Sequence, residues 1–171
     1  MFSKTDIEKY FAAEKSESLL FIFIGIAAII LAIIFFFFLK TNFYKGIALP
    51  LLLIAIVQIT VGYTVYKKSD SDRQRNVYAY DLNPAELKGK EIPRMEKVNK
   101  NFVLYRWIEI ALIAAGLVLI FLYRQQADKS FLYGLGVGIA IQAVIMLGAD
   151  YFAEARAKVY TKGLQAFTEK K

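Results

Sequence analysis

The sequence predicts an all-α integral membrane protein with four transmembrane helices, and two observations support this fold class. Three stretches are as long as a bilayer is thick and carry no charge, apart from Asp150 at the end of the third: residues 18–39, 46–66 and 130–150. Residues 102–123 form a fourth apolar stretch of similar length. The hydrocarbon core is roughly 30 Å thick and a helix rises about 1.5 Å per residue, so each stretch can cross it as one helix.

Two short turns predict how these spans are arranged. Only residues 40–45 separate the first two spans, and only residues 124–129 separate the last two. Helices joined by so few residues pack as antiparallel neighbours, so we expect two helical hairpins. The spans occupy about half of the 171 residues, which leaves too little chain for a separate soluble domain of ordinary size. Residues 1–171 are therefore expected to form a single membrane domain.

The basic residues predict the orientation. Of the 22 Lys and Arg residues, four lie in the two turns; the other 18 lie in or beside the N-terminal tail 1–17, the central loop 67–101 and the C-terminal tail 151–171. Positive charge is retained on the cytoplasmic side of a membrane. We therefore expect a multi-pass protein of the inner (cell) membrane with both termini and the central loop in the cytoplasm. The formal charge of +7 then fits contact with anionic lipid and not with nucleic acid.

Local signals predict helix ends outside the membrane. Thr5 and Glu8 have the spacing of a capping box, which fits either an interfacial helix or the first turns of the first span. Pro84 predicts a short helix in the central loop that ends at Gly89. Helices 3 and 4 are expected to extend into the cytoplasm, with Gly163 a possible end of helix 4.

Two amides lie inside the spans. Gln58 and Gln142 each follow the start of a span by 12 residues, which predicts a similar depth near the midplane, so they can meet across the bundle. A hydrogen bond between helices in a membrane is worth about 0.6 to 2 kcal/mol, and helix packing is one interpretation of the pair. A path or ligand pocket lined by the two amides is the other.

Four charged residues are expected at the inner leaflet: Arg106, Glu109, Asp150 and Glu154. Arg106 precedes Glu109 by three positions and offers it a local partner on the same helical face. Asp150 and Glu154 are four positions apart and repel each other, which favours pairing with Arg106 or with Lys158. The cluster is interpreted as an ion-pair network that fixes helix register, or alternatively as a proton or cation site.

Gly134 and Gly138 have the GxxxG spacing, which lets another helix approach closely. The partner predicted for this candidate packing interface is either the second helix of the same chain or a second protomer.

The composition argues against catalysis. The chain has no Cys and no His, so it lacks thiolate nucleophiles, disulfides and the commonest zinc and copper ligands. It also lacks the G-x-S-x-G, Walker A and H-E-x-x-H motifs. We expect no enzyme, no cofactor and no metal site.

The sequence therefore favours a non-catalytic membrane protein whose basic cytoplasmic surface contacts a partner protein, a second copy of itself or anionic lipid. The alternative is a small oligomeric transporter or channel, with the polar residues of helices 2, 3 and 4 along its path.

Overall fold

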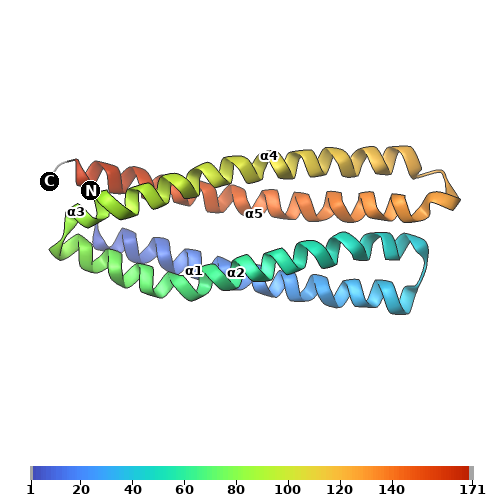
Figure 1. Ribbon diagram of the computed structural model, residues 1–171, viewed down its shortest axis with the longest axis horizontal. Helices are drawn as coiled ribbons and strands as arrows, with labels where there is room; N and C mark the ends of the chain where they lie inside the picture. The colour runs from blue at the N-terminus through green and yellow to red at the C-terminus, as the bar shows by residue number, and fades with distance from the viewer. Residues whose placement is uncertain (1, 170–171) are drawn as a thin grey trace.

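Four long helical rods lie side by side in the computed structural model, which describes residues 2–169 (Figure 1). Within these residues there is no strand, so the all-helical fold class is confirmed. The elements in chain order are α1 (Lys4–Ile33), the π-helix η1 (Ile34–Leu39), α2 (Asn42–Leu82), α3 (Pro84–Glu86), the π-helix η2 (Leu87–Glu91), α4 (Ile92–Tyr123), the 3₁₀ turn η3 (Ala127–Lys129) and α5 (Ser130–Thr168).

All four rods are long and apolar enough to cross a membrane. Counted with their flanking helical turns, they contain 36, 41, 40 and 42 residues. At about 1.5 Å per residue this is roughly 54 to 63 Å, close to twice the thickness of the hydrocarbon core. The extension beyond the span that was expected for the last two helices is therefore present in all four.

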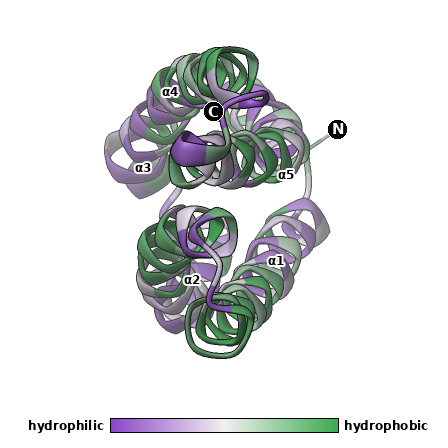
Figure 2. Ribbon diagram, turned by 90° about the vertical axis from the view of Figure 1, so that its right-hand side faces the viewer, coloured by the Kyte–Doolittle hydropathy of each residue, from purple (hydrophilic) through white to green (hydrophobic). Residues whose placement is uncertain are grey.

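Helix α5 is the central element of the packing. Helix α1 contacts α2 along its length, α4 contacts α5 in the same way, and α2 joins the two pairs by packing on α5 (Figures 1 and 2). Helices α1 and α5 meet mainly near the chain termini, at Tyr10 and Tyr160. The termini and the turn at Asn83 lie at one end of the molecule, and the two short turns lie at the other.

Several predicted helix ends are wrong. Of the two interpretations of the N-terminal segment, the first turns of the first helix are confirmed, because α1 is continuous from Lys4. The predicted cap is wrong: the cap uses Asp6, whose Oδ2 accepts a hydrogen bond of 2.8 Å from the Ser3 N–H, not the pair Thr5 and Glu8. The expected loop 67–101 is helical at every position except Asn83. This difference arises because α2 extends 16 residues beyond its span, to Leu82, and because the next rod starts at Pro84.

The two predicted glycine stops are also wrong. Gly89 lies inside the π-helical turn η2, where the backbone remains helical and runs on into α4. Gly163 lies inside α5, where its missing side chain makes room for the Phe2 ring; a Cβ there would be 2.6 Å from Phe2 Cδ2. Residues 170 and 171 of the expected C-terminal tail lie outside the described residues.

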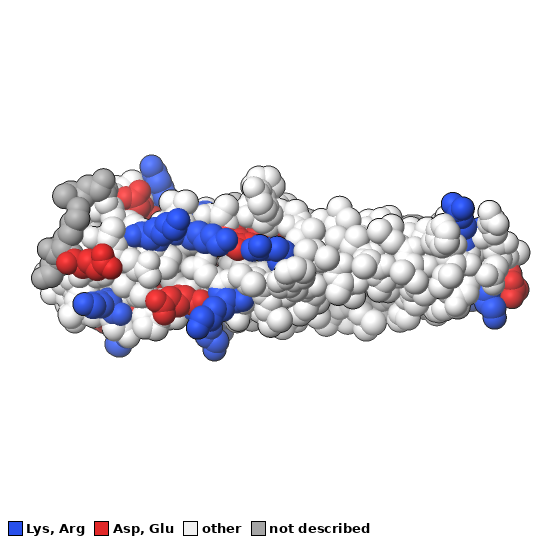
Figure 3. Space-filling view, turned by 90° about the horizontal axis from the view of Figure 1, so that it is seen from above, with Lys and Arg blue, Asp and Glu red and all other residues white. Residues whose placement is uncertain are grey.

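Charged side chains gather at one end of the molecule, which we call the head: residues 2–17, 67–101 and 150–169 (Figure 3). Between the head and the two short turns lies an apolar band, which is uncharged on the face that Figure 3 shows and in which many large apolar side chains are exposed. The head has a hydrophobic core of its own, and its buried side chains come from all four rods: Ile7, Phe11, Ala79, Leu87, Met95 and Leu164. The head is thus a packed extension of the bundle.

Candidate functional site

The head is organised around the buried carboxylate of Glu91, which is 1% exposed. Arg94 donates two hydrogen bonds to it, from Nε at 2.9 Å and from Nη2 at 2.6 Å. The Tyr160 hydroxyl donates a third at 3.3 Å, and Arg75 Nη2 lies 3.7 Å from Glu91 Oε2. Burial acts to lower the pKa of Arg94, but the hydrogen bonds to Glu91 and the attraction of the Glu91 and Glu14 carboxylates together outweigh it, so the pKa of Arg94 is raised. Glu91 therefore links residues of α2, α4 and α5.

Helix α1 is joined to this network by Tyr10 and Glu14. The Tyr10 ring stacks on that of Tyr160, and its hydroxyl donates to Glu14 Oε1 at 3.2 Å. Glu14 Oε2 accepts a bond of 3.0 Å from Ser69 on α2. Burial raises the pKa of the Glu14 carboxyl and of both tyrosines. The network joins the ends of all four rods, which is a structural role.

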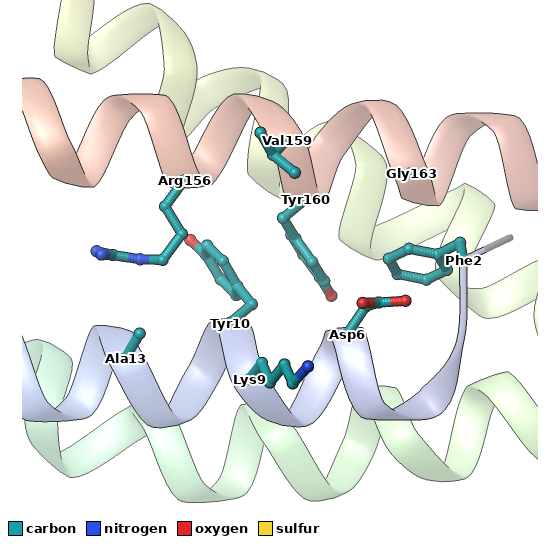
Figure 4. A pocket seen from close by; sticks show the side chains of 9 residues that line it. All are labelled: Phe2, Asp6, Lys9, Tyr10, Ala13, Arg156, Val159, Tyr160 and Gly163. Carbon is teal, nitrogen blue, oxygen red and sulfur yellow. The ribbon is translucent and has the colours of Figure 1, made fainter.

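A shallow pocket of about 500 Å³ lies on the head between α1 and α5 (Figure 4). Phe2, Tyr10 and Tyr160 form its apolar wall, and Lys9 lies at its rim. Arg156 also lines it, but its guanidinium is ion-paired with Glu17. The basic groups of this pocket are thus partly neutralised within the chain.

The charged cluster predicted at the inner leaflet forms, but with a different pairing. Arg106 Nη2 donates to both carboxylate oxygens of Glu154 on α5, and Lys158 Nζ binds the same carboxylate at 2.7 Å. The predicted pairing of these carboxylates with Arg106 or Lys158 is confirmed for Glu154, which binds both, but Asp150 forms no ion pair among the described residues. The predicted local pairing of Arg106 with Glu109 is wrong. The Arg106 guanidinium extends from α4 to α5, where Glu154 is almost fully buried. The ion pair therefore joins the two helices.

Glu109 is left without a basic partner by this arrangement. It is 2% exposed, and neither of its carboxylate oxygens accepts a hydrogen bond in the described part of the chain. Asp150, another carboxylate, lies close enough to interact with it, and both line a second pocket between α4 and α5. A buried charge with no counter-charge is unusual in a folded protein.

The structure buries both amides but does not join them. Gln58 and Gln142 are each at most 3% exposed, and the Oε1 of the first and the Nε2 of the second have no hydrogen-bond partner. Where α2 and α5 touch, a Cβ on Gly138 would lie 2.6 Å from Pro50 Cγ.

The glycine pair on α5 packs against α2 of the same chain. A Cβ on Gly134 would collide with the Phe43 carbonyl oxygen, and one on Gly138 would lie 3.0 Å from the Ile47 carbonyl oxygen. Gly136, on another face of α5, packs against Gly116 of α4, where a Cβ would lie 2.7 Å from the Gly116 oxygen. Of the two predicted partners for the GxxxG pair, the structure shows the second helix of the same chain.

Comparison with known proteins gives no assignment. No protein-family model, curated protein or solved structure matches this chain. Among residues 2–169, no group of three or more His, Cys, Asp or Glu side chains is placed to hold a metal ion. The features that remain for a function are the charged head, its exposed apolar side chains and the carboxylate-lined pocket between α4 and α5.

Sequence reasoning did not find the residues that organise the head: Glu14, Glu91, Arg94 and Tyr160. Most of their partners lie on other rods. Glu14 is 55 positions from Ser69, and Glu91 is 69 positions from Tyr160. The one local signal was Arg94, which follows Glu91 by three positions and lies on the same helical face.

Proposed function

We propose that this chain is a non-catalytic, multi-pass protein of the inner membrane, built from two helical hairpins, whose head docks a partner protein in the cytoplasm. The apolar band is the membrane-spanning part, because each rod contains one apolar stretch of bilayer length. Because 16 of the 22 Lys and Arg residues belong to the head or its border with the band and four lie in the two short turns, we place the head on the cytoplasmic side.

The observation that carries this proposal is the distance by which the packed head extends beyond the apolar band. Helix α2 continues from Lys67 to Leu82 without a break, which is 16 residues or about 24 Å. The headgroup layer on each side of a bilayer adds only about 5 to 8 Å to the hydrocarbon core. Most of the head therefore lies beyond the reach of lipid, which favours a protein partner over anionic lipid as its main contact.

Exposed apolar side chains mark a contact surface at the far end of the head. Tyr78 and Leu82 follow each other by one turn on α2 and are 62% and 68% exposed. Side chains this apolar are expected in the band, where lipid covers them, but these two lie near the turn at Asn83, far from the band. An exposed apolar pair with charged neighbours is typical of a protein contact site.

Self-association receives less support from the packing. The glycine pair predicted to allow it, Gly134 and Gly138, is covered by α2. A second protomer would have to use another surface.

Site-specific photocrosslinking in intact cells tests the docking proposal. A photoreactive phenylalanine analogue is placed at Tyr78, at Leu82, or at Phe121, a band residue that is 72% exposed and serves as the matched control. We expect one protein adduct of the same mass from both head positions and none from position 121. The adduct from position 82 should also be lost when Tyr78→Asp is added. Absence of a protein adduct from both head positions would contradict the proposal.

A small transporter is the second candidate, and one observation favours it. Glu109 is a buried, unpartnered carboxylate within a predicted span, and such residues often mark a substrate or ion path. Gln58 and Gln142 do not line the pocket that contains Glu109, so the three polar residues do not form one described path. Flux of a substrate into proteoliposomes that is lost in Glu109→Gln would favour this candidate.

A further inference from the structure

The pocket between α4 and α5 has the size and lining of a site for a small organic molecule. Its volume is about 440 Å³, within the range of roughly 300 to 1,000 Å³ typical of ligand pockets. It lies where the apolar band meets the head, and most of its wall is apolar: Phe102, Ile110, Val144, Leu147, Tyr151 and Phe152.

The polar part of the pocket carries an excess of negative charge. Glu109, Asp150 and Glu154 line it, and Arg106 is the one basic residue among its lining residues. Arg106 and Lys158 are both bound to Glu154. No ion pair among the described residues includes Glu109 or Asp150. Three carboxylates against two basic groups leave one uncompensated negative charge when all are ionised.

The buried state of Glu109 points to a ligand. Both of its oxygens lack a hydrogen-bond donor although the side chain is 2% exposed, and leaving a charged group unsatisfied in this way is costly. Asp150 is half-buried and faces the same pocket, so a group bound there can approach both carboxylates. One positive charge supplied from outside the chain would balance the site.

The lining selects the class of cation. Two free carboxylates provide fewer oxygens than the six to eight that Ca²⁺ takes, and the cavity is large compared with a bare ion. The rings of Phe102 and Phe152 offer apolar surface and cation–π contact, which suit an organic cation. Because the pocket opens at the end of the apolar band, a molecule that partitions into the membrane can reach it.

We propose that the pocket between α4 and α5 binds a lipophilic organic monocation, with the positive charge beside Glu109 and Asp150 and the apolar body against the aromatic wall. This goes beyond the docking function of the head and is independent of it. Gly148 lines the pocket, and the space beside it is open, because a Cβ built on it would meet no atom within 4 Å.

Binding of tetraphenylphosphonium to the purified full-length protein in lipid nanodiscs tests this proposal. Tetraphenylborate, which has the same shape and the opposite charge, controls for partition into lipid. We expect saturable binding of the cation at one site per chain and no saturable binding of the anion. Glu109→Gln and Asp150→Asn should each weaken cation binding at least tenfold. The exposed acid Glu96 lies outside the pocket and provides the matched control, so Glu96→Gln should bind like the unmodified protein.

Gly148→Phe tests the location of the site independently of charge. The new ring should fill the pocket and abolish binding while the thermal unfolding temperature is unchanged, because it replaces no contact within the chain. The proposal is overturned if the folded protein does not bind the cation, if the anion binds equally well, or if Glu109→Gln and Gly148→Phe both bind normally. None of these results affects the crosslinking test of the head.

Discussion

The phenol ring of Tyr10 lies parallel to that of Tyr160, with the ring centroids 4.1 Å apart and an angle of 9° between the ring planes. This stack joins the first long helix to the last, which otherwise touch little. The Tyr160 hydroxyl also donates to Glu91 at 3.3 Å. One side chain of α5 therefore contacts both the apolar core and the polar network of the head.

Two substitutions of Tyr160 separate these contributions. Tyr160→Phe keeps the stack and removes the hydrogen bond to Glu91, so we expect a loss of about 0.5 to 1.5 kcal/mol in the free energy of unfolding. Tyr160→Ala also opens a cavity in the core and should lose about 3 to 5 kcal/mol. Denaturant unfolding in a mild detergent measures both, and equal losses in the two variants would contradict this division.

Glycine substitutions on α5 test the packing against α2. Gly134→Ala and Gly138→Ala should each destabilise the protein by about 1 to 3 kcal/mol, because the new Cβ meets backbone or Pro50 atoms of α2. Gly148→Ala is the control on the same helix, and it should be neutral or slightly stabilising. The mass of the detergent-solubilised protein, measured by light scattering, should not change. A fall in mass with Gly134→Ala would instead indicate an interface between protomers.

A double-mutant cycle tests the pairing of Arg106 with Glu154. Glu154→Gln removes the partner of both Arg106 and Lys158 and should lower the free energy of unfolding by about 1.5 to 3 kcal/mol. Arg106→Gln should lose less, because Lys158 still compensates Glu154, and the double variant should lose less than the sum of the two. Glu109→Gln breaks no hydrogen bond and should be milder than Glu154→Gln. The reverse order would show that Arg106 depends on Glu109.

The raised pKa of Glu14 predicts a pH dependence of stability. Burial raises this pKa in the folded protein above its value in the unfolded chain, so the folded state holds the proton more tightly. The resulting stabilisation is fully present below the unfolded pKa and is lost as the pH rises through the folded pKa. Glu14→Gln should therefore lose less stability than the unmodified protein as the pH rises from the ordinary range of a Glu carboxyl, about 4.3, towards neutrality.

The control for Glu14 is Glu8, an exposed acid on the same helix. Thermal unfolding is recorded for Glu14→Gln and Glu8→Gln over the same pH series. A pH profile of Glu14→Gln that matches those of Glu8→Gln and the unmodified protein would contradict the assignment.

The long apolar helices could be predicted from the sequence, because the absence of charge over about 20 residues is itself the physical requirement for a span. Their extensions were partly missed. Asn83 and Pro84 mark the only break in the central segment, but Gly89 and Gly163 look like helix stops and are not. At both positions the backbone stays helical, and at Gly163 packing of Phe2 explains the residue better than local helix signals do.

Partner choice between helices could not be predicted. Arg106 and Glu109 have the correct spacing for a local pair. Arg106 instead pairs with Glu154 of α5, which is buried and also binds Lys158. The GxxxG spacing of Gly134 and Gly138 predicted a close helix contact but did not identify α2 as the partner. The position of Glu91 depends on the π-helical turn η2, for which the sequence has no recognised signal.

Thiol labelling of the two ends of the spans tests most directly whether the head lies in the cytoplasm. Because the chain has no cysteine, the reagent can react only with the cysteine that is introduced. Single cysteines are introduced as Asn42→Cys, Ala127→Cys and Ser71→Cys, all at exposed positions. A membrane-impermeant thiol reagent added to intact cells should label positions 42 and 127, and it should label position 71 only after the cells are lysed. Labelling of position 71 in intact cells, with positions 42 and 127 protected, would contradict a cytoplasmic head.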